Sequence, residues 1–274
     1  MRRLLAEHGL RPSRSRGQNF VVDPNTVRRI ARLAEVGPGD RVLEIGAGMG
    51  CLTLALAETG AAVTAVEVDA GLVAVLAEVL AGTDVKLIHA DAMRVDWDEL
   101  LGAGDGPGAP GTRCWRLVAN LPYNIATPLI ADLLDGVAQI GTMLVMVQRE
   151  VGQRLVAGPG DDGYGAVSVK VAYWASARMV GRVPATVFLP MPHVESALVE
   201  IRRNPAPAVE GDHDRAAIFE LVAAGFAGRR KMLRRALAGR VESEDFERAQ
   251  VRPEARAEEL DIAAWARLAA CRPR

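Results

Sequence analysis

Short apolar runs alternate with amphipathic segments along the first 150 residues of this 274-residue chain. Apolar runs of five or six residues bounded by turn signals predict buried strands, and the longer segments between them have helical spacing. The predicted strands are 41–45, 62–66, 85–89, 115–119 and 142–147, and the predicted helices are 24–36, 52–58, 70–81 and 127–135. Strands that alternate with helices are typical of a doubly wound α/β fold with a parallel sheet.

Proline, glycine and asparagine mark where elements begin and where the chain divides. Asp23 before Pro24 predicts a helix start, because aspartate caps a helix and proline suits its first position. The Gly/Pro-rich segment 102–113 predicts a surface loop. Asn204-Pro205-Ala206-Pro207 is typical of a linker, and only helical patterning follows over 214–274. We therefore expect an α/β domain over 1–203 and a small all-helical domain over 204–274.

Composition places the chain among globular proteins. Half of its residues are hydrophobic, which is enough for a sizeable core. It has no run of 18 or more apolar residues, and its charged N-terminus has no apolar signal core, so we expect a cytoplasmic protein without a membrane span. The three cysteines and four histidines are scattered and include no C-x-x-C pair, which fits neither a disulfide framework nor a metal site.

Charge is unevenly distributed, although the net charge is only −1. Residues 1–32 hold eight arginines against two acids, and residues 221–240 hold five arginines and one lysine without an acid, so each segment carries +6. The rest of the chain therefore carries −13. Two basic patches on an acidic body suit a phosphate backbone held at chosen places, and solvated helix faces are the alternative.

A glycine-rich loop, Gly46-Ala47-Gly48-Met49-Gly50, lies between a predicted strand and a predicted helix. Such a loop either brings backbone N–H groups close to a ligand at a helix start or is simply a tight turn. The dinucleotide fingerprint would place Gly or Ala where Cys51 stands. That departure favours S-adenosylmethionine (SAM) over NAD, because SAM has no pyrophosphate to hold. Glu44, just before the loop, suits an amino-acid ligand.

Two acids stand at the ends of the next two predicted strands. Glu67 follows 17 residues after Gly50 and is placed to accept both ribose hydroxyls of a nucleoside, or is a surface acid. Asp91 is placed either to accept from an adenine amino group or to cap a helix. Open α/β sheets bind ligands at the carboxyl ends of their strands, so three such ends in order predict a nucleoside site.

The segment Asn120-Leu121-Pro122-Tyr123 follows the strand predicted over 115–119. The Asn120 side-chain oxygen and the Leu121 carbonyl oxygen are both placed to accept from one exocyclic NH2 group, and Pro122 restricts the backbone between them. Tyr123 would lie against the ring face. The alternative is a strand end followed by a proline turn.

With SAM as the methyl donor, this segment predicts transfer to an aryl amine. Carbonyl acceptors on the N–H groups favour a pyramidal nitrogen whose lone pair points at the methyl group. Positioning and electrostatics would then carry most of the rate, and the reaction requires neither a strong base nor a metal. Phe188, in the proline-rich segment 184–192, is either a second aromatic wall for a flipped base or a core residue.

Further segments complete an ordered series of motifs. They are Gly17-Gln18-Asn19-Phe20-Val21, Gln148-Arg149-Glu150-Val151, Arg154-Leu155, Tyr164-Gly165, Ser168-Val169, 188–196, and Phe226 with Arg229-Arg230-Lys231 and Leu233. With the segments described above, they make the chain resemble the ribosomal RNA adenine N6-dimethyltransferases of the KsgA type over nearly its whole length. Val21 stands where Leu is commoner in that family, and Ala47 and Met49 replace the commoner Pro and Leu.

The resemblance implies a role for each matched residue. The residues implied to line or close over SAM are Asn19, Val21, Gly46, Glu67, Asp91 and Asn120. Those implied to hold the target adenine are Asn120, Leu121 and Tyr123, with Phe188 on its other face. Those implied to bind RNA are Arg229, Arg230, Lys231 and Arg234.

The implied reaction is N6,N6-dimethylation of two adjacent adenosines in the 3′-terminal hairpin of 16S rRNA, carried out by a monomer on a 30S assembly intermediate. Residues 1–203 would form the catalytic domain, with 1–23 contacting SAM and RNA, and 204–274 would position the rRNA. RNA is commonly read in its single-stranded loops.

Three other functions remain as alternatives. A sister family dimethylates one 23S rRNA adenine and confers macrolide resistance, but it more often has Ile at the Leu121 position and lacks the Tyr164-Gly165 pattern. A non-catalytic assembly factor on the same scaffold would tolerate loss of Gly46 or Glu67. A DNA adenine methylase shares the Asn120–Tyr123 segment but not 229–233.

Overall fold

The computed structural model describes residues 8–9, 18–102, 114–209, 214–228 and 230–271. The chain divides into two compact units. The first comprises Met1–Gly152 and Arg178–Arg203, and the second comprises Gln153–Ala177 and Asn204–Arg274. Among the described residues, no helix combines the length and the apolar character that crossing a membrane requires.

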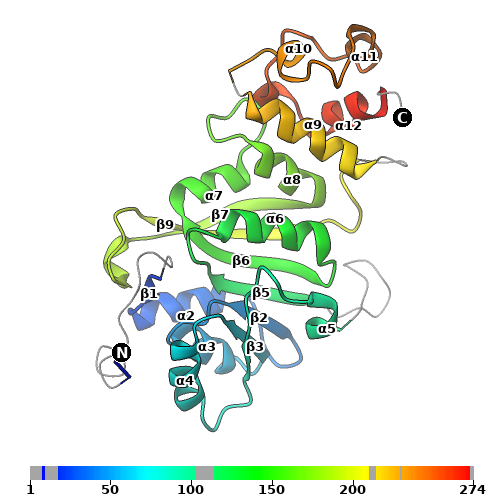
Figure 1. The fold of residues 1–274 in the computed structure, drawn as a ribbon. Coiled ribbons are helices and arrows are strands. Elements are labelled where there is room, and N and C mark those ends of the chain that lie inside the picture. Colours follow the sequence, from blue (N-terminus) through cyan, green and yellow to red (C-terminus); the bar gives the residue numbers. More distant parts are fainter. Residues whose placement is uncertain (1–7, 10–17, 103–113, 210–213, 229, 272–274) are drawn as a thin grey trace. The chain divides into compact units, whose positions relative to one another are not determined.

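A seven-stranded sheet with the order β4-β3-β2-β5-β6-β9-β7 forms the framework of the first unit (Figure 1). Its strands are β2 (Arg41–Ile45), β3 (Ala62–Glu67), β4 (Lys86–His89), β5 (Trp115–Asn120), β6 (Ile140–Gln148), β7 (Ala175–Val183) and β9 (Ser196–Arg203). Neighbours from β4 to β6 pair in parallel, as predicted, whereas β9 pairs antiparallel to β6. The sequence predicted neither β7 nor β9, and the antiparallel pairing of β9 with β6 extends the predicted parallel sheet without changing it.

Helices cover the sheet of the first unit on both faces. They are α2 (Pro24–Leu33), α3 (Cys51–Ala57), α4 (Ala70–Val79), α5 (Trp97–Leu101) and α6 (Ala126–Gly136). Helices α2 and α3 pack on the face that includes Val42, Leu144 and Leu198. Arg203 points to the other face, where its guanidinium donates to carbonyl oxygens of Leu133 and Val137 at the end of α6 (3.0 and 3.1 Å).

The start of α2 is the helix start that Asp23-Pro24 predicted. The Asp23 carboxylate accepts from the Thr26 backbone N–H at 2.8 Å, and a second bond from the Thr26 hydroxyl lowers the pKa of Asp23. The helix ends at Leu33, three residues before the predicted end at 36, because Glu35 takes a positive φ of 51° that no helix accommodates. The other predicted elements differ from the observed ones by three residues or fewer at each end.

The second unit contains helices around one hydrophobic core. They are α8 (Ala166–Trp174), α9 (Arg215–Ala227), α10 (Leu233–Ala236), α11 (Ser243–Arg248), the short η3 (Ala257–Glu259) and α12 (Ile262–Cys271). Tyr164, Val169 and Tyr173 share this core with Ile218 and Trp265. This division places residues 153–177 in the helical unit. The boundary expected from the sequence, at 204, would place them in the α/β domain. Helix α7 (Arg149–Val156) spans the point of division.

Candidate functional site

A cavity of about 300 Å³ lies at the carboxyl ends of β2, β3, β4 and β5 in the first unit. Several residues predicted to hold SAM or adenine line it. They are Asn19, Gly46, Glu67, Asp91, Asn120, Leu121 and Tyr123. Their convergence confirms that these strand ends meet at one place, which is the expectation for an open α/β sheet.

The glycine loop bends sharply between β2 and α3. Gly46, Gly48 and Gly50 all have positive φ angles, of 75°, 60° and 77°, which side-chain-bearing residues rarely adopt. A Cβ on Gly48 would lie 2.9 Å from the Phe20 ring, and one on Gly46 would lie 3.4 Å from Pro122. A side chain at Gly48 would therefore clash with the N-terminal segment, whereas at Gly46 it would meet Pro122 at an ordinary contact distance, and glycine is favoured there by its positive φ.

Glu67, at the end of β3, organises the backbone around the cavity. One carboxylate oxygen accepts from the Gly48 N–H at 2.9 Å, and the other accepts from the Val68 and Asp69 N–H groups, both at 3.0 Å. A carboxylate has about four acceptor sites, and these bonds occupy three. The carboxylate thus keeps acceptor capacity toward the cavity, and the predicted contact to both ribose hydroxyls stays a prediction.

Asp91 follows β4 and serves a local turn as well as the cavity. Its Oδ1 accepts from the Met93 N–H at 2.9 Å, and its Oδ2 lies 3.7 Å from Arg94 Nε. The next helix, α5, begins only at Trp97, so Asp91 caps a turn rather than a helix. The side chain still lines the cavity, where a carboxylate oxygen can accept from an amino group.

The Asn120 side chain is held by the N-terminal segment. Its amide nitrogen donates to the backbone carbonyl oxygen of Asn19 at 2.8 Å. This bond assigns the amide nitrogen to the Asn19 side and directs Oδ1 elsewhere as an acceptor. The segment then turns into α6 through bonds from the Ile125 and Ala126 N–H groups to the Pro122 carbonyl oxygen, each 3.1 Å long.

The Tyr123 ring is fixed at its far end by the hydroxyl of Ser196, the first residue of β9. The two hydroxyl oxygens lie 2.8 Å apart, and Ser196 is fully buried. Burial raises the pKa of Tyr123, and the bond to Ser196 opposes this rise. The phenol therefore stays neutral near pH 7 and presents a ring face rather than a base. Sequence reasoning gave Ser196 no role, because its partner is 73 residues away.

Two residues predicted at the site lie elsewhere. Val21 and Phe188 are paired across a small antiparallel sheet formed by β1 (Phe20–Val21) and β8 (Phe188–Leu189). Both side chains are buried, with exposures of 6% and 4%, in the hydrophobic cluster beneath α2. Phe188 is thus buried in the core here and does not line the cavity, so a second aromatic wall stays a prediction. Val21 anchors the segment that carries Asn19.

Glu44 also lies outside the cavity lining. Its side chain is 1% exposed, and burial raises its pKa to about 8, against the effect of the Thr53 hydroxyl and with a smaller contribution from the Glu67 carboxylate. Near pH 7 this carboxyl is largely neutral. The sequence placed Glu44 correctly before the glycine loop but could not show that the strand buries it.

The basic residues predicted to bind RNA lie in the second unit. Arg230, Lys231 and Arg234 are exposed, and Arg229 lies outside the described residues. Backbone bonds from the Leu233 and Arg234 N–H groups to the carbonyl oxygens of Ala255 and Pro253 hold this segment in place. Arg234 lies 3.8 Å from Glu254, so its charge is partly offset, while the segment as a whole stays basic.

In the described part of the chain, no group of three or more His, Cys, Asp or Glu side chains is arranged to hold a metal ion. The polar lining of the cavity consists instead of carboxylates, amides and backbone groups. Such a lining suits an organic ligand with amino and hydroxyl groups.

Comparisons with known proteins agree on one family. Residues 10–271 match the ribosomal RNA adenine dimethylase family. The chain is 48% identical to ribosomal RNA small subunit methyltransferase A of Cutibacterium acnes, over 98% of this chain and 91% of that protein. Among solved structures it resembles the 23S rRNA methyltransferase ErmE (28% identity, TM-score 0.64, 92% of this chain and 98% of the other). It also resembles a dimethyladenosine transferase from Plasmodium falciparum (21% identity, TM-score 0.73, 91% of this chain and 95% of the other). This likeness supports the fold. The chain therefore belongs to the ribosomal RNA adenine dimethylase family.

Proposed function

We propose that this protein is an enzyme that uses SAM to dimethylate N6 of two adjacent adenosines in the 3′-terminal hairpin of 16S rRNA. The observation that carries the proposal is the bond from the Asn120 amide nitrogen to the Asn19 carbonyl oxygen, 2.8 Å long. It leaves the Asn120 side-chain oxygen as an acceptor, and Asn120 and Tyr123 line the same cavity as Glu67 and Asp91.

The residues of the cavity fit SAM. Gly48 lies so close to Phe20 that a Cβ there would clash, and the loop glycines would present backbone groups to a ligand. Glu67 would accept from a ribose hydroxyl and Asp91 from the adenine amino group. SAM supplies an electrophilic methyl group when it is bound.

The protein's own residues would position the amine. The Asn120 Oδ1 and the Leu121 carbonyl oxygen accept from the two N–H groups of the target adenine, and this favours a lone pair directed away from both acceptors. Tyr123, held by Ser196, lies against the base and excludes water from one face. The amine becomes acidic as its bond to carbon forms, so its proton needs only a weak acceptor. Catalysis is then mainly orientation and electrostatics.

Two observations favour 16S over 23S rRNA as the substrate. Identity to the small subunit methyltransferase of Cutibacterium acnes is 48%, compared with 28% to the 23S rRNA methyltransferase ErmE. The residue after Asn120 is leucine rather than the isoleucine that is commoner in the 23S enzymes. We further propose a monomer that acts in the cytoplasm on a 30S assembly intermediate.

We assign methyl transfer to the first unit and rRNA positioning to the second. The exposed charges of Arg230, Lys231 and Arg234 support the second assignment, since each can contact a phosphate. We propose the same role for Arg229, which neighbours them in the sequence. Residues 1–23 would contribute Asn19 to the SAM site.

A methyl-mapping experiment tests the proposed function. The protein and labelled SAM are incubated with 30S particles that lack the modification and, separately, with 23S-containing precursors, and dimethyladenosine is mapped in each RNA. We expect label at two adjacent adenosines near the 3′ end of 16S rRNA. Label confined to 23S rRNA would refute the proposal and favour the resistance-type activity. Full activity of an Asn120→Ala variant would refute the mechanism.

A further inference from the structure

Four exposed arginines lie on edge strand β7 of the first unit or on elements next to it, outside the cavity lining. Arg29 comes from α2, Arg178 and Arg182 come from β7, and Arg202 comes from β9. We call them the arginine cluster. None of them lines the methyl-transfer cavity, so the chemistry described above does not explain them.

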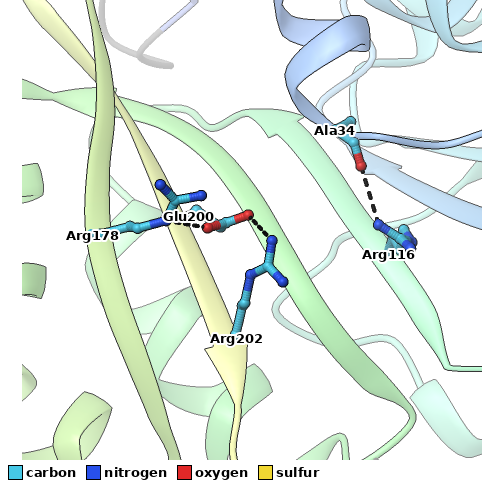
Figure 2. A network of polar contacts seen from close by, with 5 residues as sticks. All are labelled: Ala34, Arg116, Arg178, Glu200 and Arg202. Atoms are coloured by element: carbon cyan, nitrogen blue, oxygen red, sulfur yellow. Dashed lines mark hydrogen bonds and ion pairs between the residues drawn. The ribbon is translucent and has the colours of Figure 1, made fainter.

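A buried carboxylate orients two members of the cluster. Glu200 is 8% exposed and accepts from Arg178 Nε at 2.5 Å and from Arg202 Nη2 at 2.7 Å. Figure 2 shows the two guanidinium groups reaching this carboxylate from neighbouring strands. Their side chains are 68% and 55% exposed. Each guanidinium has five N–H donors, so both retain donors for a ligand, and the trio carries a net charge of +1.

Gly181 leaves space for the guanidinium of Arg29, the third member of the cluster. Arg29 donates from Nη1 to the Arg182 carbonyl oxygen at 3.2 Å, and a Cβ on Gly181 would clash with Arg29 Nη2. A side chain at position 181 would therefore displace the guanidinium from the strand. The same Cβ would lie 3.6 Å from Leu198, which is two residues before Glu200 on β9. The position of the Arg29 guanidinium is therefore close to Glu200 and its two arginine partners.

Positive charge exceeds negative charge around the cluster. Arg28 and Arg32 are also exposed on α2, which contains no acidic residue. Three acids lie around these arginines: the buried Glu200, Glu35, whose charge acts on Arg202, and Glu58, which lines a groove together with Arg28 and Arg32. Nearby Arg116 is engaged by the Ala34 carbonyl oxygen and by Asp40. The side chain of Arg182 makes no hydrogen bond or ion pair within the described ranges of the chain.

Strand β9 connects the cluster to the target-base end of the cavity. Ser196, at its start, holds Tyr123, and Arg202, near its end, pairs with Thr142 at the other end of β6. Six residues of extended chain span about 20 Å, which is the reach of a few nucleotides. RNA that places a base against Tyr123 would thus have adjoining backbone within reach of β7.

We infer that the arginine cluster is a second RNA-binding surface, which contacts phosphates of the rRNA flanking the flipped adenosine. The inference rests on the proposed function for the identity of the RNA. Arginine forks suit phosphate oxygens, and a guanidinium already oriented by a carboxylate loses less freedom on binding. The cluster is in the catalytic unit and is distinct from the basic segment at 230–235.

The test compares RNA binding by exchange variants of the full chain. Dissociation constants are measured at several salt concentrations for unmethylated 30S particles and for protein-free 16S rRNA, using Arg182→Gln, Arg178→Gln and the double variant. Lys86→Gln is the matched control, because it removes one exposed charge from β4 at the opposite edge of the same sheet. Arg182→Lys keeps the charge without the fork.

We expect the double variant to bind both RNAs roughly tenfold more weakly and to lower the slope of log K against log salt by about 1 per arginine removed. Lys86→Gln should leave the affinity and the salt slope unchanged, and Arg182→Lys should retain the slope. The double variant should keep its turnover at saturating substrate. Unchanged affinity and slope in the double variant would overturn the inference. Weakened binding to 30S particles alone would also overturn it, in favour of an acidic ribosomal protein as the partner. Failure of the wild type to methylate 16S rRNA would refute the proposed function separately.

Discussion

The hydroxyl oxygens of Tyr123 and Ser196 lie 2.8 Å apart, and this bond joins the turn after β5 to the first residue of β9. It fixes the tyrosine ring at the end remote from the backbone, where the ring would otherwise rotate. The proposed stacking on a base requires the ring to hold one orientation, and the bond would position Tyr123 without contacting the base itself.

Removing this bond should slow methyl transfer modestly. Tyr123→Phe and Ser196→Ala each remove one hydrogen bond of about 1 kcal/mol, so we expect a roughly fivefold lower single-turnover rate in each. The double variant should be no slower than either single variant, because both lose the same interaction. Tyr123→Ala, which also removes the ring, should be far slower. Additive losses in the double variant would show that the two hydroxyls act independently.

Exchange of Asn120 for aspartate separates its two functions. The substituted side chain would keep an acceptor oxygen but would place a carboxylate against the Asn19 carbonyl oxygen, which now accepts from the amide nitrogen. We expect Asn120→Asp to weaken SAM binding in calorimetry and to lower turnover by about 10²–10³, the usual effect of losing one preorganised polar contact. Asn120→Ala should lower turnover similarly. Unchanged SAM affinity in Asn120→Asp would show that the bond to Asn19 does not support the cofactor site.

Much of the site could be predicted from the sequence because parallel strands impose it. Gly46, Glu67, Asp91 and Asn120 each follow an apolar run, and the carboxyl ends of neighbouring parallel strands meet at one edge. No contact between distant segments had to be known. The order of the strands and the residue type at each end were sufficient.

The positions of Val21 and Phe188 could not be predicted in this way. They pair across β1 and β8, two-residue strands far apart in the sequence, and a run that short has no periodicity of its own. Phe188 between prolines is typical of a loop, whereas pairing buries it. The compact units also divide the chain differently from the predicted boundary at 204, since Tyr164 packs in the core that includes Trp265.

A comparison of Gly48→Ala with Gly82→Ala tests why the glycine loop needs glycine. Both residues have positive φ angles, of 60° and 83°, but a Cβ on Gly48 would lie 2.9 Å from Phe20 while one on Gly82 would meet nothing within 4 Å. Gly82→Ala should therefore lower the free energy of unfolding only by the cost of a positive φ, about 1–2 kcal/mol. Gly48→Ala should cost more in thermal unfolding and should also weaken SAM binding. Equal destabilisation of the two variants with normal SAM binding would mean that the Phe20 ring moves aside at little cost.

Exchange of Glu44 should change how stability depends on pH. Burial raises the pKa of Glu44 to about 8 in the folded protein, whereas the unfolded chain has the ordinary value of 4.5. Between these values the folded state binds more protons than the unfolded state, so the contribution of Glu44 to stability falls as pH rises from about 5 to 8 and then levels off. Over this pH range the free energy of unfolding falls by at most about 5 kcal/mol because of Glu44. Glu44→Gln, which remains neutral, should therefore gain stability relative to the wild type over this range in denaturant unfolding. Parallel pH profiles of the two proteins would show that Glu44 is ionised in the folded state.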